Sequence, residues 1–147
     1  MAFETKAFGA QDALVTALQG TASLDAWTIE FGLPARRLEQ HIWVDETIDN
    51  WNQGTATTGI VARDETFRIS VYIYSRLSGS TPQELRDDIK AAADIVSSVI
   101  GSAPFLSGAV FYAQIISAEY GSAFSDTEGR QREGYLNLVV ECQAYLA

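Results

Sequence analysis

The chain has 147 residues, a length that fits one domain covering residues 1–147. Apolar residues make up 47% of it and charged residues 20%, a balance that excludes long-range disorder. The 19 acidic side chains outnumber the 10 basic ones and give a net charge of −9, which argues against binding to nucleic acid or to an anionic membrane surface. Cys142 is the only cysteine, so an intrachain disulfide is impossible.

The first residues and the hydropathy pattern bear on targeting. Glu4 comes early and no apolar run follows it, so we expect no signal peptide. No stretch approaches the ~20 apolar residues that a membrane-spanning helix requires. We therefore expect a soluble protein that stays in the compartment in which it is made.

Periodicity predicts one short helix and two strands in the first third of the chain. Apolar residues at helical spacing over residues 10–18 indicate an amphipathic helix. Apolar and polar residues alternate over residues 27–31, and this predicted strand ends at Gly32-Leu33-Pro34. A second alternating run covers residues 38–44. Over residues 45–64 the alternation fades among threonines and glycines, which favours a β-ribbon or an extended loop over a helix.

The clearest strand prediction covers residues 67–74, where apolar and other residues alternate strictly. One face is fully apolar and consists of Phe67, Ile69, Val71 and Ile73. The other face carries Tyr72 and Tyr74 and is half-apolar. We therefore expect something to cover this second face in part.

The clearest helix prediction starts at Thr81, which is a good N-cap. Pro82 suits the first helical position, and Glu84 completes a capping box. Gly101 and Pro104 are expected to end the helix. Its apolar stripe consists of Leu85, Ile89, Ala92, Val96 and Val99. Burial of this stripe against the sheet should dominate the core.

Two more strands are predicted at the end of the chain, over residues 110–118 and 135–146. The connection over residues 119–134 contains three glycines and many charges, so we expect a long loop that is functional or mobile. The order of elements predicts an α+β fold. We expect a mostly antiparallel sheet with one long and one short helix packed on one face.

The residues that most often perform chemistry have structural explanations here. His41 is the only histidine and lies in a predicted strand beside Trp43, without a spaced Cys or His partner for a metal. A half-buried, hydrogen-bonded role is favoured over a catalytic one. Cys142 is in register with apolar residues of its strand, so we interpret it as a core residue rather than a nucleophile.

Adjacent carboxylates occur at residues 45–46, 64–65 and 87–88. Neighbouring side chains point to opposite faces of a strand and diverge by ~100° on a helix, so no pair aims both carboxylates at one substrate. The pair at 87–88 is expected on the solvated side of the long helix, with Arg86 and Lys90 as partners.

The sequence also lacks the motifs GxxxxGK[ST], GxGxxG and GxSxG, which mark phosphate-binding loops and nucleophile elbows. We therefore predict no catalytic, cofactor-binding or metal-binding residue. No cofactor is expected, and the protein is not expected to be an enzyme.

Candidate interface residues are aromatic or charged side chains that the predicted elements do not explain. Aromatic residues are enriched at interfaces, although burial in the core is the favoured interpretation for any single tryptophan. Arginines in an acidic, self-assembling protein are natural counterparts for carboxylates of a neighbouring copy, although solvated loop charge is the favoured interpretation for them. The candidates are Trp43, Trp51, Arg130, Arg132, Asp126 and Glu128.

Several segments together resemble a known family. Gly32-Leu33-Pro34 is followed closely by Glu39–Val44, and the acid pair in Arg63–Val71 runs straight into an alternating strand. Leu106–Val110 comes after the long helix, and a closing strand ends in Cys142–Leu146. This order is similar to that of small tail proteins of long-tailed actinobacterial phages, the phage tail terminator family, from about residue 10 to the end.

The resemblance implies a mixed sheet flanked by helices and a structural role in the virion. Family members form a six-fold ring that caps the tail tube, stops its growth and joins the head-proximal neck. The implied partners are other copies, the tail tube protein and a neck protein, with assembly in the host cytoplasm. DNA would pass through the ring without specific binding, and the acidic charge would repel its phosphates. We expect residues 45–64 and 119–134 to supply the contacts.

Two alternatives stay open. One is another neck or tail-completion protein, such as a head-closure or adaptor subunit, which shares the size and charge. The other is a small ferredoxin-like enzyme or ligand-binding module that uses the sheet face with Tyr72 and Tyr74 as its pocket. A dimer that binds a small molecule would favour the second alternative.

Overall fold

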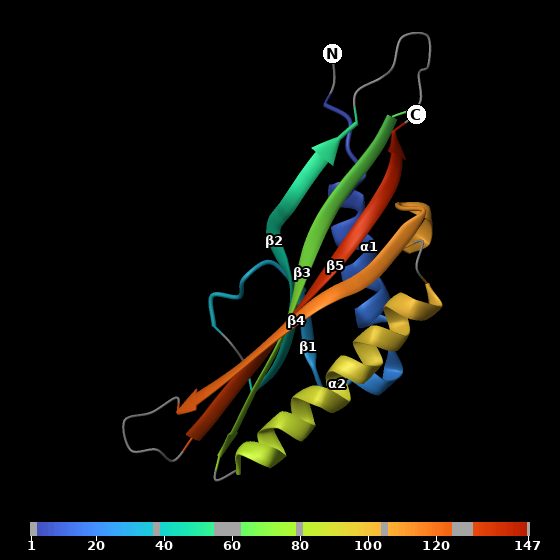
Figure 1. Cartoon of the computed structure of the whole chain (residues 1–147). Helices are drawn as coiled ribbons and strands as arrows, with labels where there is room; N and C mark the ends of the chain where they lie inside the picture. Colours follow the sequence, from blue (N-terminus) through green and yellow to red (C-terminus); the bar gives the residue numbers. More distant parts are fainter. Residues whose placement is uncertain are drawn as a thin grey trace.

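Five strands form one sheet in the order β1-β2-β3-β5-β4, and two α-helices lie against one of its faces (Figure 1). The predicted α+β class is confirmed. The strands are β1 (Thr28–Phe31), β2 (Gln40–Gln53), β3 (Arg63–Ser78), β4 (Tyr112–Phe124) and β5 (Gln131–Leu146); the helices are α1 (Ala7–Gln19) and α2 (Pro82–Ser102), with 3-10 turns η1 (Ala22–Leu24) and η2 (Leu106–Gly108). The computed structural model describes residues 3–36, 39–54, 63–78, 81–103, 106–124 and 131–146.

The sheet is mixed, because β1 pairs with β2 in parallel while the other neighbouring pairs are antiparallel. Local alternation did not predict the parallel pair. β1 has only four residues, about 13 Å of strand, and only eight residues separate its end at Phe31 from the start of β2 at Gln40. The reversal begins at Gly32, which has φ = 85° and donates its N–H to the Val44 carbonyl at 2.8 Å. β1 therefore ends where the sequence predicts.

The two longest strands, β3 and β5, pair over all 16 residues of each, which makes this ladder about 50 Å long. β4 stays paired with β5 as far as Phe124, opposite Arg132. The predicted loop over residues 119–134 is therefore wrong, because residues 119–124 and 131–134 are strand. The hairpin arm that they form lies at one end of the sheet, and both chain termini lie at the other (Figure 1).

Two of the three glycines that suggest a loop, Gly121 and Gly134, allow close packing instead. A Cβ on Gly121 would lie 3.2 Å from the Tyr135 ring, and one on Gly134 would lie 3.1 Å from the Leu85 side chain and 3.2 Å from that of Ile89. Gly134 thus lets α2 approach the sheet, and Gly121 lets an aromatic ring lie across β4.

Residues 45–53 continue β2, so the β-ribbon interpretation is confirmed for them and the loop interpretation is wrong. The register with β3 shifts within this part of the strand. Gln11 of α1 is buried and donates its Nε2 hydrogens to the backbone carbonyls of Asp45, at 3.0 Å, and Glu46, at 3.2 Å. A helix side chain therefore satisfies carbonyls in the irregular part of the strand. Residues 55–62 lie outside the described residues.

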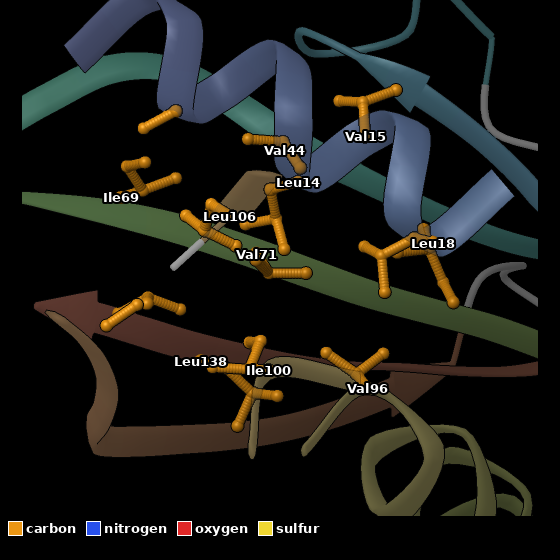
Figure 2. Close-up of a cluster of buried hydrophobic side chains, with 14 of the residues drawn as sticks. Leu14, Val15, Leu18, Val44, Ile69, Val71, Val96, Ile100, Leu106 and Leu138 are labelled. Atoms are coloured by element: carbon orange, nitrogen blue, oxygen red, sulfur yellow. The ribbon is translucent and has the colours of Figure 1, made fainter. Parts of the chain in front are cut away.

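The core lies between the helices and the sheet face that they cover (Figure 2). Strand residues at alternating positions point into it, as the patterns over 67–73 and 136–146 predict. Leu14 and Leu18 enter from α1, and Val96 and Ile100 enter from α2. The predicted α2 stripe is wrong only at its end: Ile100, four residues after Val96, is buried, whereas Val99 is partly buried.

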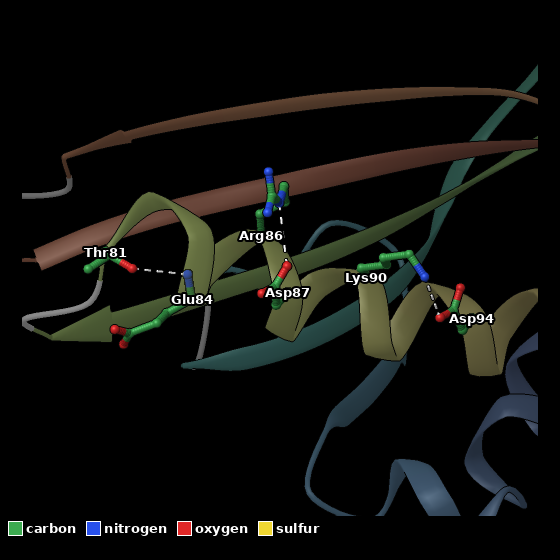
Figure 3. Close-up of polar contacts among 6 residues, drawn as sticks. All are labelled: Thr81, Glu84, Arg86, Asp87, Lys90 and Asp94. Carbon is green, nitrogen blue, oxygen red and sulfur yellow. Dashed lines mark hydrogen bonds and ion pairs between the residues drawn. The ribbon is translucent and has the colours of Figure 1, made fainter.

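Helix α2 begins as predicted, because the Thr81 hydroxyl accepts a hydrogen bond from the Glu84 N–H at 3.2 Å (Figure 3). Its end differs, since the helix continues through Gly101 to Ser102, and Pro104 lies outside the described residues. The outer side carries the ion pairs Arg86–Asp87 and Lys90–Asp94, at 3.4 and 2.8 Å (Figure 3).

The expectation that Asp88 belongs to this solvated side is wrong. Its carboxylate accepts hydrogen bonds from the Ser75 hydroxyl at 2.6 Å and from the Gln40 amide at 3.2 Å. Asp88 therefore ties α2 to strands β3 and β2. One residue of difference on a helix rotates a side chain by ~100°, which separates Asp88 from exposed Asp87. No helix in the described ranges is long and apolar enough to cross a membrane.

Candidate functional site

We call the sheet face opposite α1 and α2 the uncovered face. One row of side chains crosses all five strands there, because the pairing aligns Glu30, Trp43, Tyr72, Asn137 and Glu119. A carboxylate stands at each end of the row, on the outer strands β1 and β4. Two aromatic rings and an amide lie between them. Only the register of four strand pairs brings these residues together.

Trp43 and Tyr72 form the centre of this row. Their rings stack with centroids 5.2 Å apart and an angle of 13° between planes, and the edge of His41 meets Trp43 at 5.9 Å. Trp43 is only 4% exposed, so the ring proposed as an interface candidate is mostly buried within its own chain. Tyr74 is also buried and donates its hydroxyl hydrogen to Glu133 Oε2 at 2.6 Å. Of the two tyrosines expected to form a pocket, Tyr72 lines the pocket that opens beside these rings.

A pocket of about 310 Å³ opens beside these rings and is lined by Trp43, Tyr72, Glu119, Tyr135 and Asn137. Tyr135 forms one wall, since its ring lies across Gly121 of β4. Asn137 Oδ1 is buried and accepts no hydrogen bond from the described residues. Buried amide oxygens in folded proteins normally have a donor, and no described residue supplies one to Asn137 Oδ1.

The pocket is electronegative. Burial raises the pKa of the Tyr72 hydroxyl, and the nearby charges of Asp45, Asp49 and Glu119 raise it further. Burial also raises the pKa of Asp45, against the lowering effect of the Glu46 N–H hydrogen bond, and the neighbouring carboxylates add to the rise. Both shifts have the direction that a surface with excess negative charge produces. A cation is therefore the favoured occupant of this part of the sheet.

Trp51, the other aromatic interface candidate, belongs to a cluster at the opposite sheet face. Its ring packs edge-on against Phe3 and Phe8, both at 5.7 Å, and its Nε1–H donates to Glu65 Oε2 at 3.1 Å. Glu65 is fully buried and also accepts hydrogen bonds from the Gln53 amide at 2.8 Å. Trp51 therefore stabilises the fold of its own chain.

The same carboxylate holds the start of α1. Glu65 Oε1 accepts hydrogen bonds from the Lys6 N–H at 2.8 Å and the Thr5 hydroxyl at 3.0 Å. Burial alone would raise the pKa of Glu65, but these donors and those of Gln53 and Trp51 outweigh burial and lower it. These contacts explain why α1 starts at Ala7, earlier than predicted. Sequence reasoning missed Glu65, because its partners are distant in the chain.

The two outer strands expose large apolar side chains. At the β1 edge, Phe31 is 48% exposed, and Leu33, which follows the strand, is 63% exposed. At the β4 edge, Ile116 is 39% exposed and Tyr120 is 41% exposed. Ile116 lies where the β4–β5 register shifts. Because β1 and β4 are the two ends of the strand order, these apolar edges lie on opposite sides of the sheet.

Three of the remaining predicted residues, His41, Cys142 and Arg132, lie in the described part of the chain. His41 is buried, with Nε2 3.5 Å from Glu30 Oε1. Cys142 is buried in the core as predicted, and burial, with a smaller effect of Glu141, raises its pKa to about 12. Arg132 lies in β5, opposite Leu77 of β3. Asp126, Glu128 and Arg130 lie outside the described residues, and all six interface candidates remain predictions.

Two comparisons with known proteins give no relative. No protein-family model matches the chain. A search of curated protein sequences finds no match either. Within the ranges that the structure describes, no group of three or more His, Cys, Asp or Glu residues is placed to hold a metal ion.

Proposed function

We propose that this chain is a structural protein of a phage tail, a terminator that assembles into a six-fold ring on the tail tube. The ring would stop tube growth and join the tube to the head-proximal neck. Support comes from the order of sequence motifs between Gly32 and Leu146, which resembles that family. An α+β fold with a mixed sheet and two helices agrees with the fold that the resemblance implies.

The observation that carries the proposal is the pair of apolar edges. An acidic, charged surface would keep a monomer soluble without them, yet Phe31 and Leu33 stand exposed at one outer strand and Ile116 and Tyr120 at the other. A ring needs two different, complementary surfaces on each subunit, so that every copy contacts the next in the same way. Edges on opposite sides of one sheet meet this requirement.

The acidic charge supports the same role. DNA must pass through the ring without binding to it, and a net charge of −9 on each copy repels phosphates. The described parts of the two predicted contact segments run toward opposite ends of the sheet. Gln53 pairs with Glu65 near one end of the ladder between β3 and β5, and Phe124 pairs with Arg132 near the other end. A subunit of this shape could contact the tube at one end and the neck at the other.

The experiment measures the mass of the wild-type chain and of edge variants by light scattering, alone and after incubation with purified tail tubes. We expect wild type to reach six times the mass of one chain, in solution or on the tubes. Ile116→Asp and Phe31→Asp should each reduce ring formation at least about tenfold, because they place a charge in an apolar contact.

The matched control is Tyr145→Asp, which adds the same charge at an exposed aromatic residue away from both outer strands. It should leave ring formation unchanged. Circular dichroism must show that all three variants fold. A wild-type chain that stays monomeric with and without tubes would contradict the proposal. Equal losses of ring formation in the two edge variants and in the control would also contradict the proposal.

Position in the particle separates a terminator from another neck protein. A terminator binds at the free end of a tail tube and prevents further growth, whereas a head-closure or adaptor subunit binds to the head-side complex. Gold-labelled protein that decorates tube ends favours the terminator. Labelling only of head-side complexes would assign the chain to the neck.

The pocket on the uncovered face favours a second candidate, a small-ligand-binding module. Its volume of about 310 Å³ lies at the small end of the range for ligand sites, roughly 300–1,000 Å³. Trp43 and Tyr72 supply an apolar wall, and Asn137 and Glu119 supply polar groups. A dimer or monomer that binds a metabolite and never contacts tail tubes would favour this function over the first.

A further inference from the structure

We propose that the pocket lined by Trp43, Tyr72, Glu119, Tyr135 and Asn137 binds the guanidinium group of an arginine side chain that a partner protein presents. The proposal concerns one site and one chemical group. It deepens the proposed function and rests on it for the source of the arginine, which we assign to a neighbouring virion protein other than this chain.

The polar groups of the pocket include hydrogen-bond acceptors, so they favour a hydrogen-bond donor that carries positive charge. Glu119 offers a carboxylate, and Asn137 Oδ1 is a buried acceptor that no described residue satisfies. The five described lining residues include no lysine or arginine, so none of them places a cation at the pocket wall. Asp45 and Asp49 add negative charge close to Tyr72. An anion or a phosphate would be repelled from this site.

The aromatic walls favour a flat cation over a compact one. A guanidinium stacks on the faces of tyrosine and tryptophan rings and attracts them through the ring quadrupole. Its five N–H donors lie in one plane, so one edge can bind a carboxylate while another N–H reaches a neighbouring acceptor. Glu119 and Asn137 lie opposite each other on paired strands, where Cβ atoms are roughly 4.5–5.5 Å apart, so one planar group can reach both side chains. A lysine ammonium can satisfy the acceptors but cannot stack in this way.

The charge of the chain indicates a partner different from itself. Each copy carries 19 acidic and 10 basic side chains, so a basic segment of another protein is attracted to this acidic face more strongly than the same face of a second copy is. The pocket has room for one side chain or a small molecule. A protein side chain has no free α-amino or α-carboxylate group, and the described lining residues include no cation that would bind an α-carboxylate.

The test is an NMR titration of the ¹⁵N-labelled full chain with N-acetyl-arginine amide, which mimics an arginine within a protein. We expect saturable shifts of the Trp43 indole N–H and the Asn137 side-chain amide. N-acetyl-citrulline amide, the neutral isostere, should cause none, and N-acetyl-lysine amide should bind about fivefold or more weakly. Free arginine tests whether the pocket binds an arginine residue of a protein or the free amino acid. It should bind no more tightly than the capped form.

Two variants and one control locate the site. Glu119→Gln should weaken binding about fivefold or more, and Asn137→Leu about tenfold, because each removes an acceptor. Glu141→Gln makes the same charge change on the same face, where Glu141 instead lies 3.4 Å from Arg68, and should leave binding unchanged. The ¹⁵N spectrum of each variant reports its folding.

Each other outcome overturns the proposal. No saturable shift, equal binding of the citrulline compound, or equal weakening by the Glu119 and Glu141 variants would remove the guanidinium site. Tighter binding of free arginine than of the capped form would make it a metabolite site. Arginine-dependent association of this chain with itself would replace the partner by a second copy. Rings that cap tubes without arginine binding remove this inference alone; arginine binding by a chain that never joins tubes removes the proposed function.

Discussion

The two faces of the sheet differ in the hydrogen-bond partners of their buried polar groups. On the helix-covered face, buried Glu65 accepts hydrogen bonds from Thr5, Lys6, Trp51 and Gln53. On the uncovered face, Asn137 Oδ1 is equally hidden from solvent and has no donor among the described residues. One buried group thus has several donors, and the other has none among the described residues, so we call the first face closed and the second face open. The closed face holds the fold, and we propose that a partner binds the open face.

The largest difference should appear when one aromatic residue is removed from each face. Phe67→Ala removes a fully buried ring from the covered face and should lower the free energy of unfolding by about 3–5 kcal/mol. Tyr145→Ala removes an exposed ring that stacks on Phe111 at the uncovered face and should lower it by about 1 kcal/mol. Urea unfolding measures both. Similar losses would contradict the division into a closed and an open face.

A smaller loss, and one that depends on pH, should follow from changing Glu65. Glu65→Gln places amide hydrogens against the donors of Trp51 and Gln53, and should lower the free energy of unfolding by about 2 kcal/mol at pH 7. The folded-state pKa of Glu65 is lowered, so its contribution is complete above the unfolded pKa of about 4.3 and is lost as the pH falls through the folded pKa.

The measurement is urea unfolding of both proteins between pH 7 and pH 3. The difference between wild type and Glu65→Gln should shrink below about pH 4, because a protonated carboxyl resembles the amide. Gln53→Ala at pH 7 is a useful control, since it removes one donor and leaves the carboxylate ionised. A difference that stays constant down to pH 3 would show that Glu65 does not act through its charge.

The smallest expected difference in stability is between alanine substitutions at two glycines whose Cβ positions have similarly close neighbours. Gly134→Ala would push against the buried side chains of Leu85 and Ile89 and should cost about 1–2 kcal/mol. Gly121→Ala would meet only the Tyr135 ring, which is half-exposed and can turn outward, so the loss should stay below about 0.5 kcal/mol. Thermal unfolding compares the two variants. A larger loss at Gly121 would mean that the uncovered face is as rigidly packed as the core.

Much of the covered face could be predicted from the sequence, because its signals are local. Strict alternation over residues 67–74 and 136–146 identified two central strands and their buried sides. Thr81 and Glu84 fixed the start of α2. The parallel pairing of β1 with β2 was not predicted, because alternation within a strand does not show which strand lies beside it. The end of the α2 stripe was also not predicted, because a shift of one residue along a helix changes which side chain faces the core.

The candidate site was only partly predictable. Trp43 was singled out because it is out of phase with its apolar neighbours, and Tyr72 because it makes its strand face half-apolar. Asn137 and Glu119 gave no signal, since they join the row only through strand register. Glu119 was also assigned to a loop, because glycines that accommodate neighbouring side chains look in sequence like glycines that permit turns.

The most direct test of the central claim, that this chain works through contacts with other virion proteins, is electron microscopy of growing tail tubes with and without the protein. We predict tubes of defined length with a six-fold ring at one end when the wild-type chain is present. Tubes that grow to the same length and carry bare ends in its presence would contradict the claim.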